Sequence, residues 1–223
     1  MREIVLDTET TGLDPLAGHR IIEIGAIELV NHVPTNRTFH QYLNPDMAIE
    51  AEATAVHGIT NEHLKDKPRF DQIVEELIEF LGDARLIIHN ADFDVGFLNA
   101  EFARIGFPTL PPTRATCTVK LARRKYPGSP ASLDALCRRF AIDNSARTLH
   151  GALLDAQLLA ECYLEMMGGR QPTLVLAAER AAAAHATTAT LVARPPRPHA
   201  PSAEELEAHA ALLATLKDPV WLS

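Results

Sequence analysis

Acidic side chains occur at three places in the sequence where a predicted strand or helix begins or ends. Asp7 and Glu9 lie two residues apart at the end of the first predicted strand, so both project from the same face if the extended backbone continues through them. Two carboxylates this close repel each other unless cations neutralise them, and oxygen ligands of this kind suit Mg²⁺ or Mn²⁺. This pair therefore forms the first part of a candidate metal site.

Two later segments can complete such a site. After the predicted strand 85–89, Asp92 and Asp94 compete for one metal-binding role. Further on, His150 precedes Asp155 by five residues, which would leave the two side chains about 140° apart on a continuous helix. We therefore predict that His150 lies on a loop before a helix and that Asp155 lies within the helix.

Each of these residues alone has an ordinary explanation as a surface acid or a core histidine. Together, carboxylates at the ends of core elements and one histidine are typical of a site for phosphoryl transfer with two metal ions. In such a site the ions lie about 3.5–4 Å apart and stabilise the attacking and the leaving oxygen. A neutral imidazole, with an ordinary pKa of about 6.5, can accept a proton from the attacking water.

The elements that must position these residues follow an α/β pattern over residues 1–168. Runs rich in β-branched residues alternate with amphipathic stretches, as expected of one α/β domain with a mixed sheet flanked by helices. The close spacing of the first three strands predicts an antiparallel meander. The predicted strands are 2–6, 21–30, 37–43 and 85–89, and the predicted helices are 70–81, 94–105, 116–124, 132–140 with Ser132 as N-cap, and 153–167.

The composition changes after residue 169, which predicts three parts: a domain over 1–169, a linker over 170–203 and a tail over 204–223. Residues 177–190 contain eight alanines and residues 191–203 four prolines, which predicts a flexible linker. Ser202 and Glu205 then have the spacing of a capping box. The helix that they begin would present Leu206 and Leu213 on one side, followed by Trp221. We interpret this tail as a peptide that docks on a partner; the alternative is packing against its own domain.

Composition excludes several other classes of protein. The chain has 223 residues, 47% of them hydrophobic, without an apolar run long enough to span a membrane and without a signal peptide at its start, which predicts a cytoplasmic protein. Three cysteines without zinc-ligand spacing indicate reduced thiols. The net charge of −8 argues against a protein that holds nucleic acid mainly through a basic surface.

Three segments, 7–12, 90–94 and 150–155, resemble in order and spacing the three exonuclease motifs of the DEDD superfamily, histidine branch. The resemblance implies an RNase H-like fold and 3′-to-5′ hydrolysis of nucleic acid to nucleoside 5′-monophosphates. By the same resemblance, His150 is the base and two divalent ions, Mg²⁺ or Mn²⁺, are held by four carboxylates: Asp7, Glu9, Asp94 and Asp155. The tyrosine branch would require a tyrosine at position 151, where this chain has Gly151.

The resemblance is closest to the proofreading exonuclease subunits of bacterial DNA polymerase III and covers nearly the whole chain. It implies that a DNA 3′ end is bound by Glu52 and His57 together with Asp7, Glu9 and Asp155. It also implies that the tail, with Leu206, Leu213 and Trp221, binds the alpha subunit of the polymerase in the bacterial cytosol. A further small accessory subunit is left open.

One short segment near the start of the linker resembles the peptides that bind the bacterial sliding clamp. Its matching residues are Gln171, Leu174 and Leu176, and the alternative for this segment is an ordinary junction between domain and linker. For the whole chain, two rival functions remain: a stand-alone exonuclease of RNA ends or oligonucleotides, and an assembly module without activity. The C-terminal tail argues against the first, because a stand-alone nuclease does not need it. The presence of every catalytic residue argues against the second.

Overall fold

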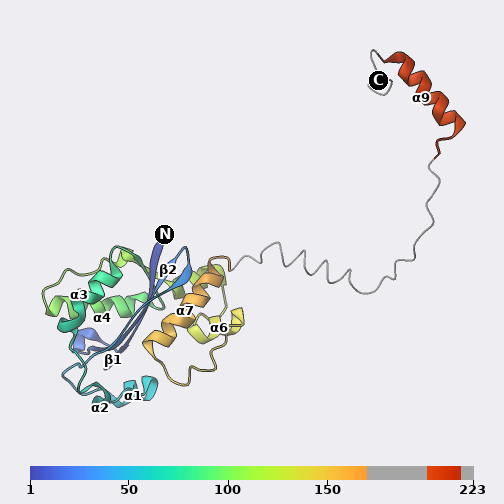
Figure 1. The fold of residues 1–223 in the computed structure, drawn as a ribbon. Coiled ribbons are helices and arrows are strands. Elements are labelled where there is room, and N and C mark those ends of the chain that lie inside the picture. The colour runs from blue at the N-terminus through green and yellow to red at the C-terminus, as the bar shows by residue number, and fades with distance from the viewer. Residues whose placement is uncertain (170–199, 217–223) are drawn as a thin grey trace. The chain divides into compact units, whose positions relative to one another are not determined.

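The computed structural model describes residues 1–169 and 200–216 (Figure 1). The chain divides into two compact units, Met1–Gln171 and Pro172–Ser223. In the first unit, helices and strands form an α/β structure with a single mixed sheet among the described residues. The second unit contains one described helix, α9 (Ala203–Thr215). It begins at the predicted capping box, in which the Ser202 hydroxyl accepts from the Glu205 amide and the Glu205 carboxylate accepts from the Ser202 amide.

The sheet has five strands in the order β3-β2-β1-β4-β5. The first three form the predicted antiparallel meander, whereas β4 pairs with β1, and β5 with β4, in parallel. Because parallel strands end at the same edge of a sheet, the ends of β1, β4 and β5 meet there. The bounds are β1 Arg2–Thr10, β2 Ile21–Val30, β3 Val33–Tyr42, β4 Arg85–Ile88 and β5 Ala115–Cys117.

Helices pack on both faces of this sheet, α3 and α4 on one face and α6 and α7 on the other (Figure 1). The prediction for residues 70–81 is confirmed without change, and α6 is capped by Ser132 as predicted, through its hydroxyl and the Ala135 amide. The bounds are α1 Ala51–His57, α2 Asn61–Leu64, α3 Phe70–Leu81, α4 Ala91–Arg104, α5 Thr118–Lys125, α6 Leu133–Phe140 and α7 Ala152–Met166.

The structure differs from the prediction in several elements. Strand β1 continues to Thr10 instead of ending at residue 6, and β3 begins at Val33 instead of residue 37, because both strands pair with β2 over these additional residues. The segment 116–124, predicted as one helix, contains strand β5 followed by α5, because three residues are too few to show a strand period and β5 exists only through its pairing with β4. Helix α4 begins three residues earlier than predicted, directly after Asn90, whose left-handed backbone (φ 68°, ψ 53°) turns the chain into the helix. Helices α1 and α2 were not predicted, since seven and four residues give little periodicity.

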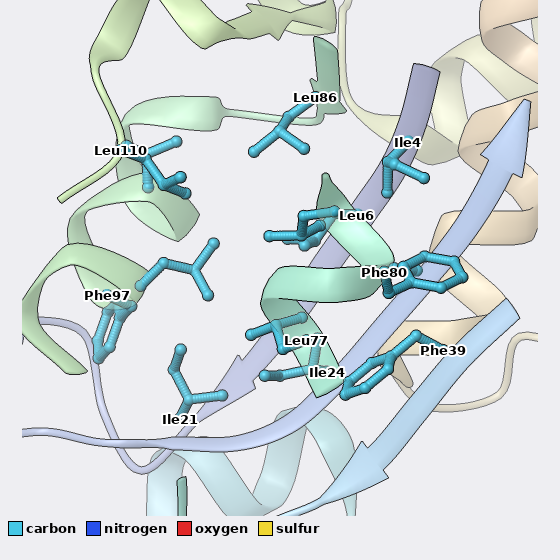
Figure 2. Close-up of a cluster of buried hydrophobic side chains, with 14 of the residues drawn as sticks. Ile4, Leu6, Ile21, Ile24, Phe39, Leu77, Phe80, Leu86, Phe97 and Leu110 are labelled. Atoms are coloured by element: carbon cyan, nitrogen blue, oxygen red, sulfur yellow. The ribbon is translucent and has the colours of Figure 1, made fainter. Parts of the chain in front are cut away.

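Alternating residues of β1 divide the core into two layers. Ile4 and Leu6 face α3 and α4, in a cluster that includes Leu77, Phe80 and Phe97 (Figure 2). Val5, between them, faces the opposite side, where it packs with residues of α6 and α7. Successive side chains of a strand point to opposite faces, so Asp7 and Glu9, which continue the Val5 series, project toward α7. The core thus fixes the direction of both carboxylates.

Candidate active site

The end of β1 carries the first two carboxylates of the site. Asp7 is half-buried and Glu9 is 8% exposed, on the face of the sheet that α7 covers. Glu9 lies opposite Glu23 of β2 in the sheet register. Glu23 is also buried and hydrogen-bonds through its Oε1 to His40 Nε2 at 2.7 Å. The strand end therefore concentrates negative charge at the edge of the sheet where β1, β4 and β5 end.

Helix α4 supplies the third carboxylate. Asp94 is 2% exposed, and its Oδ1 accepts hydrogen bonds from the Thr8 amide at 3.0 Å and from the Thr8 hydroxyl at 2.8 Å. Thr8 stands between Asp7 and Glu9, so these bonds bring Asp94 to the acidic end of β1. Asp92, by contrast, is exposed and forms an ion pair with Lys120 at 2.7 Å. Of the two competing aspartates, the structure brings Asp94 and not Asp92 to the site.

Helix α7 supplies the fourth carboxylate, and its start is held against β2. The Ala152 amide donates to Glu23 Oε2 at 3.1 Å. Because Gly25 of β2 has no side chain, the first residue of α7 can lie directly against the β2 backbone. A Cβ at position 25 would lie 2.2 Å from the backbone of Ala152. Asp155 follows in the first turn of the helix and is 3% exposed. The contacts between the start of α7 and β2 therefore determine where Asp155 lies.

His150 precedes α7, as the spacing to Asp155 predicts, because Gly151 is the N-cap of the helix. The side chain of His150 is 47% exposed, and its Nδ1 lies 3.4 Å from Asp155 Oδ2. Among the described residues, Glu9, His150 and Asp155 offer ligand atoms that all lie within 4.8 Å of one another. The exposed imidazole thus borders the carboxylates from the solvent side, where an attacking water would enter.

The sequence interpretation missed Arg147, which holds the largest share of the hydrogen bonds in the site. Its guanidinium, 8% exposed, donates to Asp155 through Nε at 2.5 Å and Nη2 at 2.7 Å, and to Asp134 through Nη1 at 2.9 Å. Nη2 also lies 3.0 Å from Nδ1 of His150. These carboxylates raise the pKa of Arg147, chiefly through the hydrogen bond with Asp155. Its position three residues before His150 does not by itself predict these contacts, which only the fold reveals.

Three carboxylates of the site, those of Asp7, Glu9 and Asp94, have raised pKa values. Burial raises the pKa of Glu9 to about 8, with a further contribution from the negative charge of Asp155. Burial also raises the pKa of Asp94 to about 7, although the hydrogen bonds from Thr8 act in the opposite direction. The pKa of Asp7 is raised well above its ordinary value by burial and by Asp94 and Glu9. A site of oxygen donors with this excess of negative charge fits a divalent cation, which would favour the ionised forms.

These shifts predict that the pH dependence of stability changes sign with the metal. In chelator the folded protein holds protons on Glu9 and Asp94 that the unfolded chain releases near pH 4–5, so stability should fall as pH rises from about 5 to 8. Bound Mn²⁺ should reverse the trend, because it binds the ionised carboxylates. Melting temperatures from pH 5 to 8.5, with chelator and with Mn²⁺, measure both slopes. Parallel slopes would contradict this account of the site.

A cavity of about 550 Å³ lies beside Glu9 and is lined in part by Glu52, His57 and Phe93. His57 Nδ1 accepts the Ile59 amide at 3.0 Å, so the proton of the neutral ring is on Nε2. Burial lowers the pKa of His57, which favours this neutral form. Nε2 is buried and has no hydrogen-bond partner among the described residues. The structure thus places both predicted nucleotide contacts, Glu52 and His57, at one cavity next to the carboxylates.

The other predicted contacts lie in or near the tail. Leu206 and Leu213 belong to α9, where Leu206 is 54% exposed and Leu213 is half-buried. Gln171, Leu174, Leu176 and Trp221 lie outside the described residues. A search of the described helices for one long and apolar enough to cross a membrane finds none.

Sequence comparison identifies the class of protein that this fold and site define. The sequence model of the exonuclease family RNase T matches residues 4–163, which include all four carboxylates and His150. Those residues make up most of the chain, which therefore belongs to this family of exonucleases, metal-dependent hydrolases.

Comparison with individual relatives shows to which group of exonucleases within this family the chain belongs. The chain is 47% identical over 228 residues to the DNA polymerase III subunit epsilon of Rickettsia felis, with 97% of both chains covered. It is 56% identical to that of Rickettsia conorii, over 77% of this chain and 76% of the relative, and 51% identical to that of Escherichia coli, over 76% and 72%. Within the exonucleases, the chain is a member of the DNA polymerase III epsilon subunits.

Solved structures agree on the fold. Exonuclease X, in complex with 5′ overhanging duplex DNA, is 29% identical with a TM-score of 0.57, over 74% of this chain and 90% of that one. E. coli Exonuclease I in complex with a dT13 oligonucleotide is 19% identical with a TM-score of 0.65, over 79% and 43%. The predicted RNase H-like fold is confirmed.

Proposed function

We propose that this protein is the 3′-to-5′ exonuclease that removes mispaired 3′-terminal nucleotides during DNA replication, releasing nucleoside 5′-monophosphates. One observation carries the proposal: four carboxylates from three elements far apart in the sequence meet at one end of the sheet beside a histidine and a cavity. The four are Asp7, Glu9, Asp94 and Asp155, and we assign to them two divalent ions, Mg²⁺ or Mn²⁺. When bound, such ions stabilise the attacking and leaving oxygens of the phosphodiester.

The residues of the chain have separate roles in this hydrolysis. His150, half exposed beside Asp155, accepts the proton of the attacking water, and a neutral imidazole is needed for that step. Glu52 and His57 hold the terminal nucleoside in the cavity, where Nε2 of His57, which lacks a hydrogen-bond partner in the described part of the chain, is the donor. Arg147 holds Asp155 in place through two hydrogen bonds to its carboxylate. The released product leaves with its phosphate on the 5′ oxygen.

Selection of mispaired ends follows from the access that the cavity requires. A terminal nucleotide must separate from its template strand before it can enter, and a mispaired one separates at a lower cost in free energy. The protein itself does not need to recognise the mismatch. A partner that holds the duplex can supply the remaining affinity for a chain whose own net charge is −8.

The test is digestion of a 5′-labelled DNA oligonucleotide with Mg²⁺ or Mn²⁺, single-stranded, mismatched or matched at its 3′ end. We expect a ladder that shortens from the 3′ end, faster by about tenfold or more on mismatched and single-stranded ends than on the matched duplex. Chelator and the Asp7→Ala variant should each remove the ladder. Equal rates on the three substrates would contradict the proofreading role, and no ladder from folded protein would contradict the nuclease.

The segments after residue 169 would connect this activity to replication in the bacterial cytosol. We assign binding of the polymerase alpha subunit to the tail, with Leu206, Leu213 and Trp221, and binding of the sliding clamp to the segment of Gln171, Leu174 and Leu176. Support comes from the exposed apolar side chain of Leu206 on a helix with a complete capping box.

Two variants separate these roles from catalysis. Removal of residues 200–223 should abolish binding to the alpha subunit, and Gln171→Ala with Leu174→Ala should abolish binding to the clamp. Both should leave hydrolysis of a single-stranded oligonucleotide within about twofold of wild type. Residues 200–223 and Leu174 belong to the second unit, and Gln171, the last residue of the first unit, follows the end of α7 in the sequence and has no assigned role in catalysis. Size-exclusion chromatography with each purified partner measures binding. Retained binding would reassign the contact to other residues.

A further inference from the structure

Helices α5 and α6 carry an excess of positive charge on a protein that is acidic overall. Helix α5 contains four basic residues and no acidic one, and α6 has two arginines in its last turn. The side chain of Lys120 is 67% exposed and pairs with Asp92. Arg123 is exposed and forms no ion pair or hydrogen bond within the described part of the chain. A local concentration of positive charge on an acidic protein raises the local concentration of anions and can steer a polyanion to that surface.

A groove of about 540 Å³ runs along this basic surface. Its lining includes His89 and Asn90, which follow β4, and Lys120, Arg123 and Ser132 from α5 and the start of α6. We call it the basic groove. It shares no lining residue with the nucleotide cavity of Glu52 and His57.

The sheet register places one end of the basic groove at the catalytic carboxylates. Leu6 of β1 pairs with Ile88 of β4, so His89 and Asn90 leave the sheet beside Asp7. Ile88 pairs with Cys117 of β5, after which α5 begins directly. The burial-lowered pKa of His89 also responds to the charges of Arg147 and Asp155, which agrees with this proximity. The end of the groove that His89 and Asn90 line is therefore the end nearest Asp7, and from there the groove follows α5 on the β4–β5 side of the site. The nucleotide cavity lies on the β1–α1 side.

A nucleic acid strand with its 3′ end at this site needs room on both sides of the scissile phosphate. The terminal nucleoside lies on one side, and the strand that leads to it lies on the other. With the cavity of Glu52 and His57 assigned to the terminal nucleoside, the basic groove remains for the adjoining strand. Lysine and arginine side chains are the usual ligands of phosphodiester oxygens, and Arg123 has its donors free among the described residues.

We propose that the basic groove binds the phosphodiester backbone of the single strand just upstream of the scissile phosphate, through Lys120 and Arg123. The inference rests on the proposed exonuclease function. In the bound state Lys120 exchanges Asp92 for a phosphate, so Asp92 opposes binding. The groove thus offers basic side chains to the strand although the net charge of the whole chain is −8.

The test compares two substrates on the same variants. A single-stranded ten-nucleotide DNA contains the upstream phosphates, whereas the p-nitrophenyl ester of thymidine 5′-monophosphate has only the terminal nucleoside and the phosphate to be cleaved. For Lys120→Gln with Arg123→Gln, we expect KM for the oligonucleotide to rise about tenfold or more. The negative slope of log(kcat/KM) against log salt should become shallower by about 1.4, at about 0.7 for each of the two phosphate contacts that are lost. Both constants for the ester should stay within about twofold.

Two further variants make the result specific. Lys65→Gln with Arg69→Gln removes one exposed lysine and one exposed arginine from another surface, so KM for the oligonucleotide should change by less than about twofold. Asp92→Asn should lower KM for the oligonucleotide, because it removes the competitor of the phosphate. An unchanged KM in the Lys120/Arg123 variant would overturn the proposal. A wild-type protein that cleaves neither substrate would instead contradict the proposed function.

Discussion

Alanine in place of His150 should lower the single-turnover rate of hydrolysis by about 10²–10⁴-fold, which is the usual contribution of a general base. The change should leave the fold intact, because the side chain is about half exposed and lies before α7, where it contacts Arg147 and Asp155. The rate is measured with enzyme in excess over a single-stranded oligonucleotide, so product release does not enter the measurement.

A control variant and a metal-binding measurement show whether the lower rate comes from the loss of a general base. His63 is another exposed histidine, so His63→Ala should keep the wild-type rate within about twofold. Calorimetric titration with Mn²⁺ distinguishes a lost base from a lost ligand, since His150 offers a nitrogen near the donor atoms of Glu9 and Asp155. A His150→Ala rate within about threefold of wild type would exclude the role of base, and loss of Mn²⁺ binding would reassign His150 as a ligand.

A single methyl group at position 25 should disable the enzyme without touching any catalytic residue. In Gly25→Ala the new Cβ would meet backbone atoms of Ala152 and Leu153 at 2.2 Å, and backbone cannot rotate away as a side chain can. Helix α7 must therefore move outward, which displaces Asp155 from Asp7 and Glu9. A displacement of about 1 Å costs on the order of 10²-fold in rate, and overpacking lowers stability by about 1–3 kcal/mol.

Gly96→Ala is the matched control for this substitution. The Cβ that it adds would have one neighbour within range, Pro15 Cγ at 4.0 Å, which is an ordinary contact. Since Gly96 lies inside α4, alanine there should preserve the rate and raise stability by up to about 1 kcal/mol. Urea unfolding and the single-turnover rate are measured on both variants. If Gly25→Ala retained the wild-type rate, the contact between β2 and α7 would not position Asp155.

Much of the site was accessible from the sequence because its residues follow local rules. The spacing of Asp7 and Glu9 places them on one face of a strand, and that strand continues a buried hydrophobic series. The five-residue interval from His150 to Asp155 cannot place both on one side of a helix, and α7 begins between them. The choice of Asp94 over Asp92 came from the family motif, and the structure supplies a physical reason in the bonds from Thr8.

The residues that sequence reasoning missed act through contacts between distant elements. Arg147 matters because α6 brings Asp134 and α7 brings Asp155 to its guanidinium. Glu23 matters because β2 places its carboxylate at the start of α7. No local pattern distinguishes either from an ordinary surface charge. The same limitation explains why strand β5 was not predicted: its three residues are too few to show an alternating pattern, and they form a strand by pairing with β4.

The contacts that complete the site span long stretches of chain: 86 residues separate Thr8 from Asp94, and 129 separate Glu23 from Ala152. Closing such long loops is slow, and a chain is synthesised from its N-terminus at about 5–20 residues per second. During synthesis, the β1 carboxylates therefore emerge well before α7 can dock on β2. A chain that has not yet reached His150 and α7 lacks both His150 and Asp155, so the set of site residues becomes complete only after most of the catalytic unit has been synthesised.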